Sequence, residues 1–326
     1  MKINHDVTRK TPACRVVKQR LSQRDIPGYL RNRIQWHFYP RLFILREYPL
    51  HVDIELSSHC QLNCPMCFRF HRKVENQGNM GFDSFKKIID EISGKVFSIK
   101  FTGRGEPFMN KEFIKFIEYL KGKKFGEIAI ITNGEFITED LMHAVIDGNI
   151  DRIAFSIDGL KEEYEKIRTP MKYKEIIRIV RQLYELRNKK GRNRPFIRIQ
   201  SVKTSIENEK AFLDIWKYIS DEVLFLEYKD YSIEASRAEQ TLYPCPLLYQ
   251  RMMIHWNGSV PMCINDEYEE SVMGNVLQAS IKEIWKGLSF SSARDVHKKN
   301  LRAKVYKNCS ICALHHKGHG KTLFNN

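Results

Sequence analysis

The sequence predicts an α/β fold in which helices pack outside a parallel sheet. Short apolar segments typical of buried strands alternate with segments whose apolar residues recur every three or four positions. Six such strand–helix units follow one another between residues 51 and 228. Consecutive strands that are joined through helices pair in parallel, because the helix returns the chain to the end of the sheet where the previous strand began.

The six predicted strands are short and rich in β-branched or aromatic residues, which suit a pleated and half-buried surface. They are expected at residues 51–56, 97–101, 127–131, 152–157, 195–202 and 222–228. The helices between and after them are expected at residues 82–93, 110–120, 138–147, 160–189 and 207–219. In the first helix, Phe85, Ile88, Ile89 and Ile92 share one face, so this face is predicted to cover the sheet.

Residues 1–50 are predicted to form a basic, partly helical extension. They carry eleven Lys and Arg against three Asp and Glu, a net charge of +8, which is about half of the +15 of the whole chain. Helical spacing is present at residues 16–24 and 29–43 and is interrupted by Pro27-Gly28 and by Pro40. Such basic segments are solvated, or they attract phosphates, nucleic acid or an anionic surface, so nucleic acid stays open as a partner.

The pattern of the chain predicts neither a membrane-spanning segment nor a secretion signal. No stretch approaches about 18 uninterrupted apolar residues, and the first residues lack the apolar core of a signal peptide. We therefore expect a cytoplasmic protein with no membrane partner. In that compartment its eight cysteines stay reduced and available to metal.

Three cysteines lie close together directly after the first predicted strand. Cys60, Cys64 and Cys67 stand in the run Cys-Gln-Leu-Asn-Cys-Pro-Met-Cys. Three thiolates on one tight loop can each hold one iron of a [4Fe–4S] cube, which leaves the fourth iron open to a small molecule. Zinc sites favour paired cysteines or cysteine–histidine pairs, and a disulfide framework would not crowd three thiols on one loop.

The C-x3-C-x2-C spacing of these cysteines resembles the signature of the radical S-adenosylmethionine (SAM) superfamily. The resemblance implies that the open iron binds the amino and carboxylate groups of SAM. One electron from the cluster then cleaves SAM into methionine and a 5′-deoxyadenosyl radical, which abstracts a hydrogen atom from the substrate. The resemblance also implies a partial (β/α)6 barrel with its chemistry at the carboxyl ends of the strands, and an external one-electron reductant such as flavodoxin or ferredoxin.

Residues at the ends of the predicted strands match the SAM-binding positions of this family. By the resemblance, the loop after the second strand receives the methionine ammonium of SAM. The ends of the third and fourth strands contact its ribose and its carboxylate, and an arginine pairs with this carboxylate. In chain order these residues are Met66, Gly105, Glu106, Asn133, Ser156, Asp158 and Arg168. Met66 stands where many members place an aromatic ring against the adenine, and Arg104 replaces the first glycine of the family's Gly-Gly-Glu motif.

A second set of cysteines follows the predicted barrel. Residues 252–263 predict a β-hairpin around Asn257-Gly258. Four thiolates can ligate every iron of one auxiliary cluster, or a tetrahedral zinc ion. The hairpin and the terminal C-x2-C resemble the twitch region, a short relative of the SPASM domain, and this resemblance implies an auxiliary cluster of the [4Fe–4S] type. Its ligands would be Cys245, Cys263, Cys309 and Cys312.

The predicted organisation is a basic extension at 1–50, a radical SAM partial barrel at 51–235 and a twitch/SPASM-like auxiliary cluster region with its β-hairpin at 236–326. Two clusters suit a dehydrogenation, in which the auxiliary cluster takes one electron from the substrate radical. The short region is similar to that of radical SAM aminocyclitol dehydrogenases, so the expected substrate is a sugar or cyclitol, and the positive charge favours an anionic one. Candidate substrate contacts are Arg104, Arg198, Gln200 and Glu227.

Other functions stay open at the level of the sequence. A radical SAM sugar epimerase would return a hydrogen atom to the substrate, and a ribosomal-peptide maturase would oxidise or crosslink a peptide. A protein that is not an enzyme could instead carry electrons on an iron–sulfur cluster, or bind nucleic acid through its basic extension around a zinc site.

Overall fold

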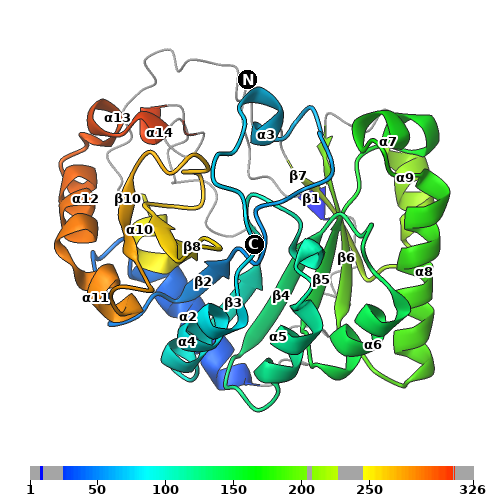
Figure 1. Ribbon diagram of the computed structural model, residues 1–326, viewed down its shortest axis with the longest axis horizontal. Coiled ribbons are helices and arrows are strands. Elements are labelled where there is room, and N and C mark those ends of the chain that lie inside the picture. Colours follow the sequence, from blue (N-terminus) through cyan, green and yellow to red (C-terminus); the bar gives the residue numbers. More distant parts are fainter. Residues whose placement is uncertain (1–7, 10–24, 204–207, 227–244, 311, 313–326) are drawn as a thin grey trace.

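A single curved sheet organises the molecule in the computed structural model, which describes residues 8–9, 25–203, 208–226, 245–310 and 312 (Figure 1). The sheet order is β1-β7-β6-β5-β4-β3-β2-β8. Strands β2 to β8 pair in parallel, and β1 joins β7 antiparallel at the edge. The strand bounds are β1 Thr8–Arg9, β2 His51–Ile54, β3 Ser98–Phe101, β4 Glu127–Thr132, β5 Arg152–Ser156, β6 Phe196–Val202, β7 Glu222–Leu226 and β8 Arg251–Ile254.

Helices cover the convex face of the sheet, as the apolar periodicity predicts (Figure 1). They are α4 Phe82–Ile92, α5 Phe113–Leu120, α6 Glu139–Asp147, α7 Lys161–Ile167, α8 Tyr173–Lys189 and α9 Glu209–Trp216. The predicted α/β fold of six strand–helix units is confirmed. The helices expected within 160–189 are α7 and α8. One detail differs: a 3-10 turn at Pro107–Met109 precedes α5.

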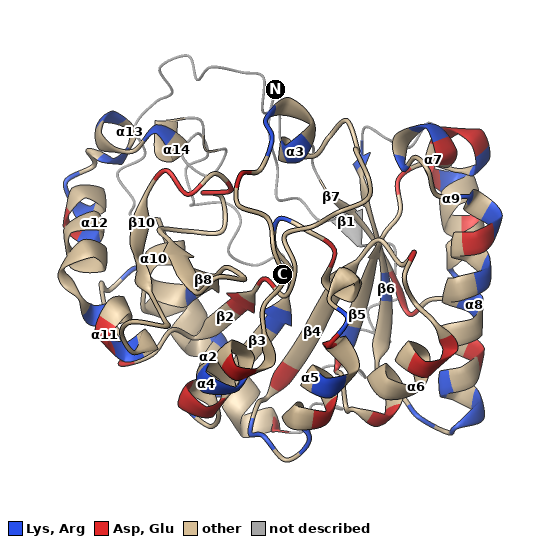
Figure 2. Cartoon of the chain, in the orientation of Figure 1, with Lys and Arg blue, Asp and Glu red and all other residues tan. Residues whose placement is uncertain are grey.

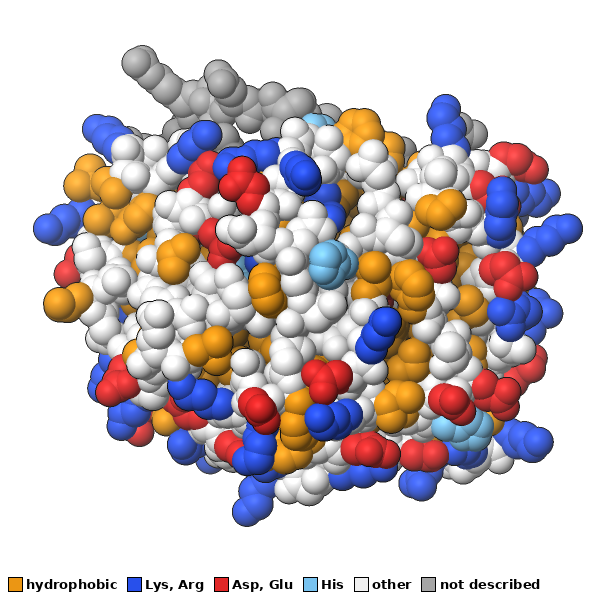
Figure 3. Space-filling model, in the orientation of Figure 1, with side chains coloured by type: hydrophobic (Ala, Val, Ile, Leu, Met, Phe, Trp, Pro, Cys, Tyr) orange, Lys and Arg blue, Asp and Glu red, His pale blue; other side chains and the backbone are white. Residues whose placement is uncertain are grey.

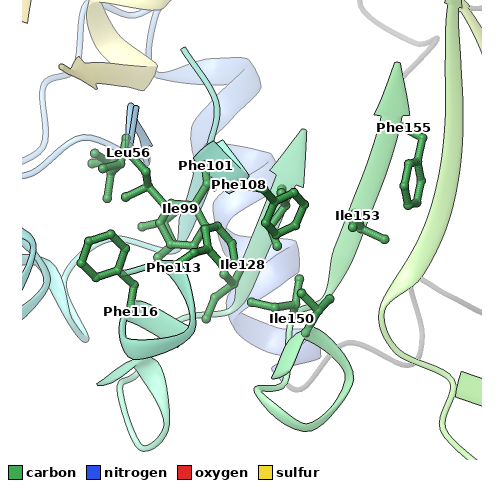
Figure 4. Packing of buried hydrophobic residues seen from close by; sticks show 14 of the residues in the cluster. Leu56, Ile99, Phe101, Phe108, Phe113, Phe116, Ile128, Ile150, Ile153 and Phe155 are labelled. Carbon is green, nitrogen blue, oxygen red and sulfur yellow. The ribbon is translucent and has the colours of Figure 1, made fainter. Parts of the chain in front are cut away.

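The core lies between the sheet and these helices. Ile99 and Phe101 of β3 are fully buried there and pack with Phe113 and Phe116 of α5 (Figure 4). Because successive strand side chains point to opposite faces, Lys100 between them points to the concave inner face. The same alternation in the other strands gives the barrel a polar interior beneath its carboxyl-terminal opening.

The N-terminal helix α2, Ile26–Phe38, closes the opposite end of the sheet. Tyr29 lies 6.4 Å from Phe97, between ring centroids, just before β3, and the backbone carbonyl of Trp36 accepts a 2.7 Å hydrogen bond from Gln250, just before β8. The predicted interruption at Pro27-Gly28 falls in the first turn of α2, where proline is tolerated, and the helix begins just before it, at Ile26. Asp25 caps that turn by accepting a 2.8 Å hydrogen bond from the Gly28 amide. The predicted helical segment at 16–24 lies outside the described residues.

The C-terminal part contains a two-stranded antiparallel sheet of β9 Ser259–Pro261 and β10 Val272–Asn275. The predicted tight turn at Asn257-Gly258 is present, with the Gly258 amide donating to the His255 carbonyl at 2.9 Å. The strand before that turn differs from the prediction, because β8 pairs in parallel with β2 and β9 pairs with β10. The helices of this part are α10 Leu247–Gln250, α11 Ile281–Lys286, α12 Leu288–Lys298, α13 Arg302–Val305 and α14 Lys307–Ser310.

The boundary at residues 235 and 236 stays a prediction, and it falls within the residues that the structure leaves undescribed. Strand β8, which lies beyond it, hydrogen-bonds into the barrel sheet. Among the described residues, no helix is both long and apolar enough to span a membrane. Acidic and basic side chains of the outer helices are intermixed on the face shown in Figures 2 and 3.

Candidate active site

A cavity of about 210 Å³ opens at the carboxyl ends of β2 to β5. All three cysteines of the first motif line it, from the loop after β2. Most of the predicted SAM-binding residues join them from the neighbouring loops, although these residues are far apart in the sequence. Those that line the cavity are Met66, Gly105, Glu106, Asn133, Ser156 and Arg168.

The three thiols are in a setting that disfavours a free thiolate. Burial raises the pKa of Cys60 to about 11, and it also raises the pKa values of Cys64 and Cys67. The charge of a neighbouring thiolate raises the pKa of Cys60 and of Cys67 further, whereas the Arg168 guanidinium opposes the rise at Cys64. Cationic iron would offset this cost, because it binds sulfur in the thiolate form.

The arrangement of the donors fits a cluster better than a single ion. Among the described residues, no three His, Cys, Asp or Glu side chains are placed to hold one metal ion. A mononuclear zinc site needs its sulfur atoms to converge on one point at about 2.3 Å. In an iron–sulfur cube each thiolate binds a different iron, so three cysteines can line one cavity without converging.

Glu106 is a buried carboxylate at the end of β3. Its oxygens accept hydrogen bonds from the Asn133 amide and the Thr132 hydroxyl, both at 2.7 Å, and from the Phe108 amide at 3.1 Å. Burial nevertheless raises its pKa to about 7. A cation bound beside it would keep it ionised, which fits its predicted contact with the methionine ammonium.

The loop that carries Glu106 packs directly on the segment before the cysteine motif. The Glu106 amide donates to the His59 carbonyl at 2.8 Å. A Cβ atom at Gly105 would lie 2.3 Å from that carbonyl oxygen and 2.5 Å from the Ser57 carbonyl oxygen. Only glycine permits this backbone approach, which brings the loop after β3 next to the loop after β2.

Asp158 and Arg168 are paired with each other. The Arg168 Nε donates to Asp158 at 2.9 Å, and Asp158 also accepts from the Ser201 hydroxyl at 3.0 Å and the Val202 amide at 2.6 Å. Asp158 is fully buried and does not line the cavity, whereas Arg168 does. This geometry favours Arg168 as the group that meets a ligand and Asp158 as the group that orients it.

Gln61 is a residue of this site that the sequence alone did not single out. Its amide nitrogen donates to the Asn133 side-chain oxygen at 3.3 Å and to Glu135. Asn133 in turn lies 4.0 Å from the Cys60 sulfur, measured from its side-chain nitrogen. Gln61 therefore connects the cysteine loop to the end of β4, and only its position next to Cys60 could have pointed to it.

Arg104 is held by two carboxylates at the rim of the cavity. Its Nε and second terminal nitrogen donate to Glu55 at 2.9 and 2.8 Å, its amide donates to Glu55 at 2.7 Å, and the other terminal nitrogen donates to Glu269 at 2.8 Å. Glu269 also contacts His255 Nδ1 at 2.9 Å, and this hydrogen bond lowers the pKa of Glu269 to about 2, with Arg104 adding to the effect. The contacts favour a positioning role for Arg104 over the predicted substrate contact.

Replacing Arg104 with Met is expected to lower the free energy of unfolding by about 3–5 kcal/mol, because it leaves the fully buried Glu55 without its counter-charge. Chemical denaturation of the protein measures this change. Lys86→Ala is the matched control, since Lys86 forms an exposed ion pair with Asp90, and its loss should cost less than about 1 kcal/mol. Equal effects of the two substitutions would contradict the buried-pair interpretation.

A second cavity collects the other four cysteines. Cys245, Cys263, Cys309 and Cys312 all line it, although 67 positions separate the first from the last. Burial raises the pKa of Cys245 to about 11 and raises those of Cys263 and Cys309, with the charges of neighbouring thiolates adding to each rise. Four thiols that line one cavity can each bind a different iron, so they fit a fully ligated iron–sulfur cluster.

Two polar side chains approach the sulfur atoms of this second cavity, and the sequence did not single out either. Asn265 donates from its side-chain nitrogen to Cys312 at 3.8 Å. His297 of α12 lies 3.7 Å from the Cys309 sulfur, measured from Nε2. Hydrogen bonds to sulfur tune the reduction potential of iron–sulfur clusters. Neither residue belongs to a recognisable motif; the packing of α12 places His297, and the loop after Cys263 places Asn265.

The segment at 266–271 joins the two cavities. Tyr268 donates its hydroxyl to the carbonyl of Phe68, next to Cys67, at 2.8 Å, and its ring packs edge-on against that of Phe68 at 5.7 Å. At the other end of the segment, Asp266 donates its amide to the Cys263 carbonyl at 3.0 Å and accepts from Asn308 at 2.5 Å. The segment therefore contacts Phe68, which lines the first cavity, and Cys263, which lines the second.

The remaining candidate substrate residues lie on the inner face of the sheet. Gln200 donates to the Ser156 hydroxyl at 3.0 Å, so it lies next to the cavity. Arg198 lies one inward position deeper and donates to Glu222 at 2.5 Å. Glu227 lies outside the described residues.

Comparison with known proteins agrees with both cysteine sets. Residues 54–198 match the model of the radical SAM superfamily. Residues 245–313 match the SPASM model, an iron–sulfur cluster-binding domain. These two ranges contain the two cysteine motifs and the loops that line the two cavities.

Several proteins are similar over most of the chain. The tungsten-containing aldehyde ferredoxin oxidoreductase cofactor-modifying protein of Pyrococcus furiosus is 24% identical, over 81% of this chain and 87% of its own. The S-adenosyl-L-methionine-dependent 2-deoxy-scyllo-inosamine dehydrogenase of Niallia circulans is 23% identical, over 79% of this chain and 92% of its own. The solved structure of BtrN in complex with AdoMet and 2-DOIA shares the fold, with a TM-score of 0.52 at 19% identity over 85% of this chain and 96% of its own.

The cofactors follow from these domains. The protein uses a [4Fe–4S] cluster that binds SAM and an auxiliary iron–sulfur cluster, so the zinc alternative for the second cysteine set is set aside. It is an enzyme of the radical SAM oxidoreductase type, which also sets aside an electron carrier and a nucleic-acid-binding protein without catalytic activity. The chain belongs to the radical SAM superfamily and carries a SPASM-type cluster-binding region at its C-terminal end.

Proposed function

We propose that this enzyme dehydrogenates a carbinol of an anionic sugar or cyclitol-type substrate. The observation that carries the proposal is the second four-cysteine cavity, which the segment at 266–271 connects to the SAM cavity. Oxidation of a substrate radical needs a one-electron acceptor, and a fully ligated cluster suits that task. The 2-deoxy-scyllo-inosamine dehydrogenase among the relatives supports the same reaction class.

The net reaction removes two hydrogen atoms from the substrate. SAM on its cluster supplies the radical that takes the carbinol hydrogen, and the auxiliary cluster supplies an acceptor for the one electron that the resulting carbon radical gives up. The hydroxyl proton leaves to a base or to water, and the carbon–oxygen single bond becomes a carbonyl. A flavodoxin or ferredoxin would return the electron that each SAM cleavage consumes.

Residues of this chain would bind and orient the reacting molecules. Cys60, Cys64 and Cys67 would hold the SAM cluster, and Glu106 and Arg168 would receive the ammonium and carboxylate of methionine. Gly105, Asn133, Ser156 and Met66 would complete the SAM pocket. The auxiliary cluster, which we take to be [4Fe–4S], would be held by Cys245, Cys263, Cys309 and Cys312.

The inner face of the sheet supports an anionic substrate. Four cations point there, namely Lys100, Arg152, Arg198 and Arg251, against the three carboxylates of Asp53, Glu127 and Glu222. The side chains of the four cations are only 15% to 25% exposed, so salt screens their charges weakly. An incoming phosphate or carboxylate would be attracted to this interior.

Lys100 provides a pH test of anion binding. Burial lowers its pKa to about 8, although the neighbouring Asp53 opposes this, with 3.0 Å between Nζ and Oδ1. Lys100 is charged below that value and loses its proton as the pH rises through it, so KM for the anionic substrate should rise about tenfold above pH 8. In Lys100→Arg the guanidinium stays charged, and KM should remain flat over the same range. An unchanged KM profile in the wild-type enzyme would contradict the role of Lys100.

Isotope transfer distinguishes dehydrogenation from the alternatives. The experiment incubates the reconstituted enzyme with SAM, a reductant and a panel of phosphorylated sugars and cyclitols deuterated at one carbinol carbon. Deuterium should appear in 5′-deoxyadenosine, and the product should be two hydrogens lighter. A product that has exchanged its deuterium for one solvent hydrogen, with no further hydrogen lost, would show epimerisation. Turnover of an added peptide but of no sugar or cyclitol would show a maturase. Either result would overturn the proposal.

A further inference from the structure

Helix α2 exposes an apolar stripe to solvent. Ile26, Leu30, Ile34 and Phe38 recur every four residues, and Leu42 continues the row beyond the end of the helix; these side chains are 38% to 61% exposed. The face turned toward the protein instead buries Gly28 and Asn32. Surface helices normally direct their apolar residues to the core, so this inverted pattern indicates a partner other than the described residues.

Cations border the stripe. At 3.6 residues per turn, Arg31 follows one edge of the stripe and Arg33 the other. Arg41 lies one turn beyond the end of the helix, and Lys298 of α12 sits 5.1 Å from the ring centroid of Phe43. One terminal nitrogen of Arg33 lies 3.1 Å from Nε2 of His37, one turn further along the helix.

The sequence around α2 carries a strong charge bias. Residues 10–46 contain nine Lys and Arg and a single acidic residue, Asp25. Asp25 is the helix cap and bonds to the Gly28 amide. Two copies of this chain that met through their stripes would bring two such basic segments together, which like-charge repulsion opposes. The complementary partner is therefore apolar at its centre and negatively charged at its edge.

We propose that α2 docks the enzyme on an anionic lipid bilayer surface. An interfacial helix with an apolar stripe between rows of Arg and Lys buries the stripe at the boundary of the acyl chains and pairs the cations with lipid phosphates. The sequence predicted no membrane partner because it contains no spanning segment, although its basic N-terminal segment suits an anionic surface. The exposure of the stripe revises that expectation.

Docking through α2 leaves the catalytic cavity free. Tyr29 and Trp36 place α2 at the amino ends of β3 and β2, against Phe97 and His51 (Figure 1). The cysteines of the SAM cavity lie at the opposite, carboxyl ends. A bilayer under α2 would hold the protein with this cavity facing the aqueous phase, so the docking is independent of the reaction class.

Co-sedimentation with vesicles tests the proposal on the full, cluster-loaded chain. The probes are vesicles of phosphatidylcholine alone and of phosphatidylcholine mixed with phosphatidylglycerol. Binding should require phosphatidylglycerol, weaken as salt is raised, and fall by about 10- to 100-fold in Leu30→Asp/Ile34→Asp. Leu288→Asp is the matched control, because Leu288 is an apolar residue that is 91% exposed at the first position of α12 and does not belong to the stripe; it should bind as the wild type does.

The stripe lies on the surface, so its variant should keep the wild-type circular dichroism spectrum and rate of SAM cleavage. Equal binding to both kinds of vesicle, no binding to either, or an equal loss in Leu288→Asp would overturn the proposal. A dimer in light scattering that Leu30→Asp/Ile34→Asp dissociates, without vesicle binding by the wild type, would identify a second copy as the partner and would also overturn it.

Discussion

Replacing Cys60, Cys64 and Cys67 together with Ala is expected to abolish formation of 5′-deoxyadenosine from SAM. Without these thiolates the first cavity cannot hold an iron–sulfur cube, and no other cysteine lines it among the described residues. Chromatography of the quenched reaction measures the product. The iron that remains should be about four atoms per chain, held by the second cysteine set.

The triple variant should still fold, because the three cysteines stand in the loop after β2 and only Cys64 belongs to the buried apolar core, where alanine is also apolar. Its circular dichroism spectrum is the control for this. SAM cleavage that persists in a folded triple variant would show that other residues hold the first cluster.

Replacing Cys309 and Cys312 with Ala should remove about four irons and stop substrate turnover while SAM cleavage survives in part. The two groups of cysteines line separate cavities, so loss of one thiolate shell leaves the other intact. Turnover is expected to fall more steeply than cleavage, because the substrate radical would have no nearby electron acceptor. Iron analysis and parallel assays of 5′-deoxyadenosine and oxidised product separate the two effects.

His297→Gln is the control for the Cys309→Ala/Cys312→Ala variant, because it keeps all seven cysteines of the two cavities. His297 lies 3.7 Å from the Cys309 sulfur, so this variant should retain its iron. Full turnover by a Cys309→Ala/Cys312→Ala enzyme that has lost its second cluster would rule out an obligatory electron-accepting role for that cluster.

The parallel sheet and the two cysteine sets could be predicted because strand–helix alternation and cysteine spacing can be read directly from the sequence. Strand–helix alternation places Glu106, Asn133 and Ser156 at one edge of the sheet, and the cavity there contains all three. Short-range spacing likewise marks Cys60, Cys64 and Cys67. The predictions that depend only on residues close together in the sequence agree with the structure.

Contacts between segments that are far apart in the sequence were not predicted. Arg104 donates a hydrogen bond to Glu269, which lies 165 positions further along the chain. Strand β8 pairs with β2, although the rest of the barrel lies between them in the sequence. Apolar periodicity reports the face that an element buries but not its neighbour in the sheet, so β8 was placed in a hairpin. The contacts of Arg104 with Glu55 and Glu269 were not predicted for the same reason, since an arginine in a strand-end loop suits a substrate as well as a carboxylate.

The number and identity of the iron–sulfur centres test the account most directly. Electron paramagnetic resonance of the anaerobically reconstituted and reduced wild-type enzyme, with about eight irons per chain, should show two cluster signals. Addition of SAM should change one signal, because one cluster has an open iron, and it should leave the other unchanged. A single signal with about four irons, or two signals that SAM leaves untouched, would contradict a SAM-binding cluster beside a separate auxiliary cluster.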